Sequence, residues 1–324
     1  MATMKAIQIQ RHGGTEVLEY VDLPRPEVTG NKILVKNHAI GVNFIDIYHR
    51  TGLYKVSLPF ILGHEGAGVV EFIGEGVTDF APGDQVVYMA SDCYAEYTLV
   101  PSSHAFKIPA NIKFKEAAAF LLQGLTCWTL VTQSYAVQKG DYVLIHAAAG
   151  GCGLLLTQLS KLLGAHVIGT TSNAQKAELA KKAGAEYVIN YTTENVVEKV
   201  NEITNGLGVH VVYDGVGKDT FEVSLAAARR LGTVISFGNA SGLVPPFTIA
   251  RLADKNLRLM RPSLMNYVTT KEEFQKYTKE LFDLIQENKI SLLNVQVHKL
   301  SDAKKAHEYL ESRKTTGKLI LELV

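Results

Sequence analysis

The chain has 324 residues, 47% of them hydrophobic, which is enough for two cores because single cores seldom grow past about 250–300 residues. Its net charge of +1 leaves no large basic surface for nucleic acid or an anionic membrane. No run of 18 apolar residues and no apolar leader is visible, so we expect no spanning helix and no signal peptide. Three widely spaced cysteines indicate a reducing compartment, and we expect a cytoplasmic protein without disulfides.

The first 121 residues predict a compact, mostly antiparallel β domain. Short alternating stretches are separated by turn signals such as Pro82-Gly83-Asp84. The expected strands cover residues 5–10, 32–39, 66–73, 85–89 and 96–101. A helix over 115–132 is then expected to lead into the second half of the chain.

From Asp141 onward, apolar strands alternate with helices of about 10–15 residues, which predicts a parallel sheet with helices on both faces. The expected strands cover 142–146, 167–169, 187–189, 209–214, 233–238 and 257–260. The expected helices cover 154–163, 174–183, 194–203 and 221–231.

The tail predicts two helices and a closing strand. A capping box formed by Thr270 and Glu273 begins the first helix, the second covers 302–311, and the strand covers 318–324. We expect the tail to complete the N-terminal domain. A catalytic domain would then cover 1–124 and 264–324, and a dinucleotide-binding domain would cover 125–263.

The segment 141–153, DYVLIHAAAGGCG, predicts a strand, a turn of small residues and the start of a helix. The spacing Ala148-x-Gly150-x-x-Gly153 matches the dinucleotide fingerprint, with alanine in the first glycine position. Gly150 would let the backbone approach a pyrophosphate, and Gly153 would let the helix pack close to the strand. The alternative is a packing turn that binds no ligand.

Three motifs in order along the chain, GHEGAG (63–68), PGDQV (82–86) and the alanine-glycine turn, resemble the medium-chain dehydrogenase/reductase superfamily over essentially the whole chain. Four segments are similar to its zinc-free quinone oxidoreductases, the zeta-crystallin-like group: GVNFIDIYHRTGLY (41–54), HAAAGGCG (146–153), YDGVG (213–217) and SFGNASG (236–242). This resemblance implies an α/β fold class, with a Rossmann-type doubly wound parallel sheet domain and a GroES-like, mostly antiparallel β domain.

The chain departs from the zinc alcohol dehydrogenases where those enzymes bind metal. A catalytic zinc needs three protein ligands. Asn43 and Leu122 occupy the places of the family's two cysteines, which leaves His64, and Cys93 stands alone where a four-cysteine lobe would lie. We expect no metal site and no metal dependence. His64 is expected to bond within the domain core, the alternative being a metal ligand.

Without a Lewis acid, the enzyme suits an acceptor that is already electrophilic, such as a quinone or an activated alkene. The candidates for lining the acceptor site are Asn43, Asp46, Tyr48 and Tyr54. Asn43 would donate its amide to an acceptor oxygen, and the tyrosines would offer hydroxyls and aromatic walls, with ordinary packing as their alternative. For Asp46, a hydrogen bond on the nicotinamide side and a local turn are both open.

NAD-preferring folds place an acidic residue about 20 residues past the glycine turn. Here residues 169–173 read GTTSN, and their hydroxyls and amide would accept a phosphate without repulsion, so we expect NADP(H). The resemblance places Lys176 and Tyr191 on the adenosine 2′-phosphate near Ser172, although Lys176 could instead be a solvated helix lysine.

The other expected cofactor-binding residues come from several segments. They are Gln123 and Thr126 near the nicotinamide, Gly150, Gly151, Cys152 and Gly153 in the turn, Phe237, Asn239 and Ser241 after the fifth strand, and Arg313 from the tail. For Arg313, a solvated charge at a helix end is the alternative.

The sequence thus favours an NADPH:quinone oxidoreductase that acts without metal. An alkenal or enone reductase is a second hypothesis with the same chemistry. A third is an RNA-binding, crystallin-like protein with little turnover, which the near-zero net charge disfavours. The apolar edge strand at 257–260 (LRLM) predicts a homodimer, because a two-fold partner would pair it.

Overall fold

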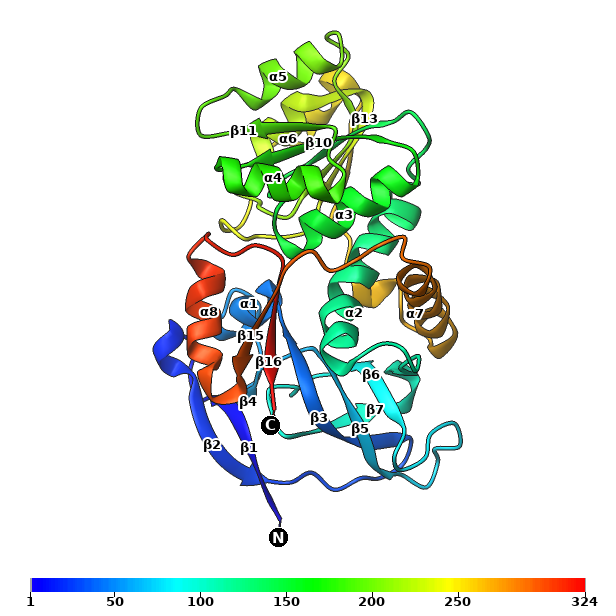
Figure 1. Cartoon of the computed structure of the whole chain (residues 1–324). Helices are drawn as coiled ribbons and strands as arrows, with labels where there is room; N and C mark the ends of the chain where they lie inside the picture. The colour runs from blue at the N-terminus through cyan, green and yellow to red at the C-terminus, as the bar shows by residue number, and fades with distance from the viewer. Residues whose placement is uncertain (1, 324) are drawn as a thin grey trace. The chain divides into compact units, whose positions relative to one another are not determined.

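The computed structural model describes residues 2–323; Met1, which begins the expected N-terminal domain, and Val324, which ends the expected closing strand, lie outside the described residues. The chain divides into two compact units (Figure 1). Unit 1 comprises the residues up to Gln123, 269–286 and those from Asn294 onward, and unit 2 comprises 124–268 and 287–293. Over residues 2–323, no helix has both the length and the apolar character that a membrane crossing requires.

Unit 2 is built on a six-stranded sheet in which every pair of neighbouring strands is parallel. Its strands are β9 (Tyr142–Ile145), β10 (His166–Thr171), β11 (Tyr187–Asn190), β12 (Val209–Asp214), β13 (Ala228–Ser236) and β14 (Arg258–Met260). Their order is β11-β10-β9-β12-β13-β14, so the chain winds outward from β9 in both directions. This is the expected doubly wound, Rossmann-type sheet.

Four helices cover this sheet: α3 (Gly151–Leu162), α4 (Ala174–Ala183), α5 (Val196–Ile203) and α6 (Phe221–Ala227). The first two lie on one face and the last two on the other (Figure 1). Because both faces are covered, the central strands are apolar along their length, with Leu144, Val212 and Val234 fully buried.

The helix expected over 221–231 is shorter in the structure. It ends at Ala227 because β13 begins at Ala228, whose partner is Val209 on β12. The register of these strands shifts before Val211, and Leu231 has a left-handed φ of 63°. The local sequence looks helical, but strand pairing overrides that preference.

Unit 1 contains a seven-stranded sheet with the path β15-β16-β3-β5-β6-β8, to which β7 adds by pairing with β3. A three-stranded sheet, β2-β1-β4, completes the β structure. The strands are β1 (Thr3–Ile9), β2 (Glu19–Pro24), β3 (Lys32–Val42), β4 (Phe60–Ile61), β5 (Glu65–Ile73), β6 (Gln85–Met89), β7 (Tyr97–Pro101), β8 (Ala105–Lys107), β15 (Val295–Lys299) and β16 (Lys318–Glu322). Among the described residues of unit 1, only β15 and β16 pair in parallel. The expected, mostly antiparallel β domain is confirmed.

The helices of unit 1 include one that sequence patterning does not predict. They are α1 (Phe44–Thr51), α7 (Lys271–Gln286) and α8 (Ala303–Glu311), while α2 (Phe114–Thr129) crosses the junction and continues as a π-helical turn over Leu130–Ser134. Short 3-10 segments cover Thr15–Val17, Ser102–His104 and Leu300–Asp302 in unit 1, and Ile249–Lys255 and Leu264–Asn266 in unit 2. The predicted capping box of α7 is confirmed, since Thr270 and Glu273 exchange hydrogen bonds of 3.0 and 3.2 Å.

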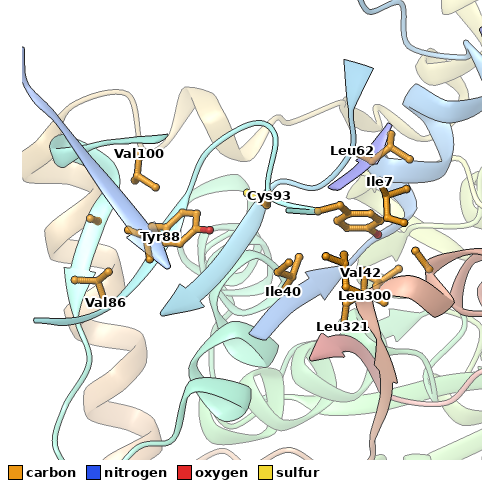
Figure 2. Close-up of a cluster of buried hydrophobic side chains, with 14 of the residues drawn as sticks. Ile7, Ile40, Val42, Leu62, Val86, Tyr88, Cys93, Val100, Leu300 and Leu321 are labelled. Carbon is orange, nitrogen blue, oxygen red and sulfur yellow. The ribbon is translucent and has the colours of Figure 1, made fainter. Parts of the chain in front are cut away.

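The core of unit 1 fixes the strands that carry the candidate site. Figure 2 shows its side chains, with Tyr88, Val86 and Val100 toward one end and Ile7, Leu62 and Val42 toward the other. Val42 and Leu62 are fully or almost fully buried. They anchor the chain one residue before Asn43 and two residues before His64, so these polar side chains follow directly from a packed apolar layer.

Candidate active site

In unit 2, the glycine turn leads into a helix whose N-terminus lacks a side-chain cap. Gly150 is the N-cap residue of α3 and accepts the first helical hydrogen bond, from Leu154 N at 2.9 Å. A Cβ at Gly153 would overlap the Ala147 carbonyl oxygen, so only glycine permits this close approach. The N–H groups of Gly151, Cys152 and Gly153 therefore form the kind of helix terminus that binds phosphate.

The ends of β10 and β11 bring together the residues expected to meet a 2′-phosphate. Tyr191 N donates to Thr171 O at 3.1 Å, which joins the two strand ends, and the Tyr191 side chain is 50% exposed. Ser172 follows on the β10 side, and Asn173 caps α4 by accepting from Lys176 N at 2.9 Å. Lys176 is half-buried, and burial lowers the pKa of its ammonium group.

Asp214, at the end of β12, organises the turn YDGVG and was not anticipated from the sequence. Its buried Oδ1 accepts from the backbone N–H groups of Val216 and Gly217 at 2.9 and 3.0 Å. Thr220 and Ser224 each donate to the carboxylate at 2.7 Å. The available signal was an Asp that ends a strand and precedes a helix carrying hydroxyl residues on one face.

The segment after β13 contains three expected cofactor residues. The Phe237 ring packs over Gly215, where a Cβ would lie 2.8 Å from the ring, and Asn239 is buried. The Ser241 hydroxyl donates to Val216 O at 2.9 Å and accepts from Asp219 N at 3.0 Å, so it joins two loops at this edge.

In unit 1, Asn43 belongs to a buried polar cluster with Glu65 and Lys318. Lys318 Nζ donates to Glu65 Oε1 at 2.6 Å and to Asn43 Oδ1 at 2.7 Å. Asn43 Nδ2 donates to Glu65 Oε1 at 2.7 Å, and Leu122 N donates to Glu65 Oε2 at 2.7 Å. A Cβ at Gly41 would overlap the Glu65 carboxylate, which explains the glycine there.

The expected role of Asn43 is therefore corrected. Lys318 can only donate and the Glu65 carboxylate can only accept, so the orientation of the Asn43 amide is fixed by its neighbours. Besides its bond to Glu65, the Asn43 Nδ2 atom makes a longer contact with Gly41 O, at 3.5 Å. Asn43 thus directs its amide N–H groups into the protein rather than toward an acceptor, and it joins β3 to the tail.

Asp46 lies in the first turn of α1 and is completely buried. Its Oδ2 accepts from Asn43 N at 2.8 Å and from the Tyr94 hydroxyl at 2.9 Å, and its Oδ1 lies 2.8 Å from His64 Nδ1. Although burial alone would raise it, the pKa of Asp46 is lowered, because His64 and other donors stabilise the carboxylate. Of the two interpretations of Asp46, these contacts correspond to the local one, because the Asp46 carboxylate caps α1 and holds His64.

The hydrogen bonds continue from Asp46 to the surface. The Tyr94 hydroxyl lies 3.1 Å from His307 Nε2, and His307 Nδ1 lies 3.1 Å from Arg50 Nη1. Arg50 then forms a bidentate ion pair with Glu311 at 2.7 and 2.9 Å. Burial lowers the pKa of His307 to about 4, so this histidine is neutral near pH 7.

Tyr48 and Tyr54 form an aromatic group with two histidines. Their ring centroids are 5.1 Å apart and meet edge to face, and Tyr54 lies 6.2 Å from His49. The His49 ring in turn lies 4.7 Å from that of His64. Burial and the neighbouring His64 lower the pKa of His49 to about 4. The sequence predicted the two tyrosines but not the histidine that joins them to His64.

The remaining expected residues are placed as follows. Gln123 Nε2 donates to Asn43 Oδ1 at 3.3 Å, while its Oε1 is buried without a hydrogen-bond partner. Thr126 is half-buried on α2, in unit 2. Arg313 follows α8 as an exposed residue with a left-handed φ of 60°. Over residues 2–323, no three His, Cys, Asp or Glu side chains are grouped so as to hold a metal ion.

Comparisons with known proteins match both units. Residues 29–110 match the alcohol dehydrogenase GroES-like domain, and residues 151–284 match the zinc-binding dehydrogenase family. Quinone oxidoreductase 1 of Escherichia coli is 46% identical over 321 residues, covering 97% of this chain and 98% of that protein. The structure of the Escherichia coli quinone oxidoreductase complexed with NADPH has a TM-score of 0.96, at 45% identity, covering 98% of this chain and 100% of that one. A 2-haloacrylate reductase of Burkholderia is 36% identical over 328 residues, covering 98% of each chain.

A Rossmann-type sheet with an uncapped glycine turn, combined with a GroES-like β unit, defines the medium-chain class of dehydrogenases and reductases. Similarity along the full length then fixes the position within that class. The chain belongs to the quinone oxidoreductase family of the medium-chain dehydrogenase/reductase superfamily.

Proposed function

We propose that this protein reduces quinones with NADPH and without a metal. The observation that carries the proposal is the carboxyl edge of the unit 2 sheet. There, an uncapped helix N-terminus at Gly150 lies one strand away from a phosphate-compatible edge formed by Ser172, Lys176 and Tyr191. The names of the relatives, quinone oxidoreductases with one complexed with NADPH, support the same activity.

The residues present fit NADPH. The N–H groups of Gly151–Gly153 would hold the pyrophosphate, and Lys176 with Ser172 and Tyr191 would hold the 2′-phosphate. The buried Gln123 Oε1 lacks a donor, and a carboxamide N–H of the nicotinamide would supply one. In unit 2, Phe237, Asn239 and Ser241 after β13 and Thr126 on α2 are further candidates for cofactor binding. In unit 1, Arg313 after α8 is a candidate.

When bound, the cofactor supplies the hydride, and the protein supplies position and electrostatics. We assign Tyr48 and Tyr54 to the walls of the acceptor site, because their edge-to-face packing on α1 and the following turn fixes both rings. A quinone needs no Lewis acid, since hydride addition leaves an aromatic hydroxylate, and such hydroxyls ionise near the tyrosine pKa of about 10.

A steady-state assay with NADPH, NADH and a panel of quinones tests this function. We expect NADPH-dependent reduction that continues unchanged after dialysis against a strong chelator, with no stoichiometric zinc by elemental analysis. Simple primary alcohols should not be oxidised. Activity that is lost on chelation and restored by one zinc per chain would contradict the metal-free proposal.

A second candidate is the reduction of an activated carbon–carbon double bond. Its support is the 36% identical relative named 2-haloacrylate reductase. The chemistry differs in one respect. Hydride addition to an enone leaves an enolate, which is more basic than the aromatic hydroxylate that a quinone leaves. Comparing kcat/KM for matched enones and quinones distinguishes the two, and a higher value for enones would favour this candidate.

We also propose a homodimer that forms through unit 2. β14 lies at the end of the sheet, Met260 is 36% exposed, and Leu259 is half-buried, so the strand has a free edge with apolar side chains. A two-fold partner would continue the sheet. Light scattering at micromolar concentration should give twice the chain mass, and Leu259→Lys should reduce it to one chain. A monomeric wild type would contradict this proposal.

We place the protein in the cytoplasm. The three cysteines are free, and two of them, Cys93 and Cys127, are buried thiols. Free thiols of this kind suit a reducing compartment. Fractionation of the source cells tests this placement. Recovery of the protein in the membrane or secreted fraction would contradict it.

A further inference from the structure

The buried chain of hydrogen bonds in unit 1 has a single direction, which Arg50 sets. A guanidinium group only donates, so His307 Nδ1 must accept from Arg50 Nη1. The neutral His307 therefore carries its proton on Nε2, which donates to the Tyr94 oxygen. The Tyr94 hydroxyl is left to donate to Asp46 Oδ2.

This direction fixes the tautomer of His64. The second oxygen of Asp46, Oδ1, is an acceptor that faces His64 Nδ1 at 2.8 Å, so Nδ1 carries a proton in both charge states of the imidazole. The proton that His64 gains or loses is consequently the one on Nε2. The His64 side chain is 17% exposed, so it can recover that proton from solvent, whereas Asp46 cannot.

Several titratable groups face His64 from the elements packed around it. Asp46 and His49 face it from α1, Asp92 faces it from the loop after β6, and Tyr94 lies behind Asp46. Burial raises the pKa of Asp92, while that of His49 lies at about 4. The His49 and His64 rings are tilted by 45° to each other, and of these two it is His64 that pairs directly with a carboxylate, that of Asp46. Its ring contacts His49, which joins it to Tyr54 and the proposed acceptor wall.

We propose that His64 donates the proton in quinone reduction and that Asp46, Tyr94, His307 and Arg50 position it; this inference rests on the proposed function. Hydride addition reduces the quinone by two electrons and oxidises the nicotinamide by two. The Nε2–H bond of His64 breaks as an O–H bond forms on the hydroquinone oxygen. The electron pair stays on Nε2, which takes a new proton from solvent, so the sum is NADPH, quinone and a proton giving NADP⁺ and hydroquinone.

The central test compares His64→Gln with the wild-type protein, using NADPH and 1,4-benzoquinone. General acid catalysis contributes about 10²–10⁴-fold, and a weakly basic hydroquinone anion places the expected fall in kcat near 100-fold. The limb of the kcat–pH profile that belongs to His64 should disappear, while the Kd for NADPH, from fluorescence titration, should not change. The matched control is His166→Gln, which removes an imidazole from a surface pair with Glu186 and should keep wild-type kinetics.

Two further measurements test the positioning residues. In ¹⁵N NMR spectra, the neutral His64 should carry its proton on Nδ1, and a spectrum with the proton on Nε2 would overturn the assigned direction. Tyr94→Phe removes one hydrogen-bond donor from the Asp46 carboxylate, which then holds the proton of His64 more strongly. The limb of the kcat–pH profile assigned to His64 should therefore move to higher pH. A purely structural role for Tyr94 would lower stability without moving that limb.

The outcomes separate the inference from the function on which it rests. If the wild-type protein binds NADPH but reduces none of the quinones, the proposed function fails, and the donor role fails with it. If the wild-type protein turns over and His64→Gln retains both kcat and pH profile, only the donor role is overturned.

Discussion

The choice between NADPH and NADH depends on a few atoms at the end of β10. Lys176 lies in the first turn of α4, after Ser172 and the capping residue Asn173, and residues 169–173 contain no acid. A lysine can pair with a 2′-phosphate but has no such partner on a 2′-hydroxyl. Lys176→Ala should therefore raise KM for NADPH about tenfold or more and leave KM for NADH nearly unchanged, as charge-assisted bonds contribute about 1.5–3 kcal/mol. Equal changes in both values would contradict the assignment.

The two glycines of the turn should respond differently to the same methyl group. A Cβ at Gly150 would lie 3.3 Å from Ala147 O, which the turn can accommodate, whereas at Gly153 it would overlap that backbone oxygen. We expect Gly150→Ala to keep its thermal midpoint but to bind NADPH more weakly. Gly153→Ala should lose about 1–3 kcal/mol of stability, as overpacked sites do. Calorimetry combined with NADPH titration of both variants checks this, and the reverse pattern would refute it.

At the scale of elements, β16 attaches the tail to unit 1 through a buried ion pair. Lys318→Met would leave the Glu65 carboxylate buried without its cation, and breaking such pairs costs about 3–5 kcal/mol. Adding Glu65→Gln should recover most of the loss, because the amide still accepts from Leu122 N and needs no counter-charge. Urea midpoints of the single and double variants measure both effects. A double variant no more stable than Lys318→Met would show that the charge was not the cause.

The same pair shows which elements can be predicted from a sequence and which cannot. Most strands and helices of unit 2 were predictable because their apolar residues follow a clear period, and α4 also ends at a glycine, Gly184. The exception is α6, which ends at Ala227, where strand pairing begins. The eight-residue α1 gave too little periodicity, although Asn43 followed three residues later by Asp46 is a capping pattern. Glu65 and Lys318 are 253 positions apart, and no local pattern reports a contact at that separation.

For the whole molecule, buried neutral histidines predict how stability changes with pH. The pKa of His307 is about 4 in the folded protein and about 6.5 when unfolded, so the unfolded chain binds more protons between these values. The contribution of neutral His307 to the free energy of unfolding is then fully present above pH about 6.5. It falls by about 3 kcal/mol as the pH falls toward 4. The half-buried His49 acts in the same direction with a smaller effect. The lowered pKa of Asp46 contributes only below pH about 4, where its stabilisation is lost.

Urea unfolding followed by circular dichroism at pH 7.5, 6 and 4.5 measures this slope. His307→Gln should be less stable than the wild type at pH 7.5 but should lose less on acidification. Parallel curves for the two proteins would mean that another group carries the acid sensitivity.

The late position of Lys318 also affects how the chain can fold while it is being made. Domains generally fold as units during synthesis. Most of unit 2, residues 124–268, leaves the ribosome as one continuous stretch and can close its sheet at once. Unit 1 begins to be made before unit 2 yet is completed after it, because Glu65 stays without its cation and β3 without β16 until Lys318–Glu322 emerge. The part of unit 1 that is made earliest therefore stays incomplete longest, and a stop codon before Lys318 would damage the first half of the protein rather than the last.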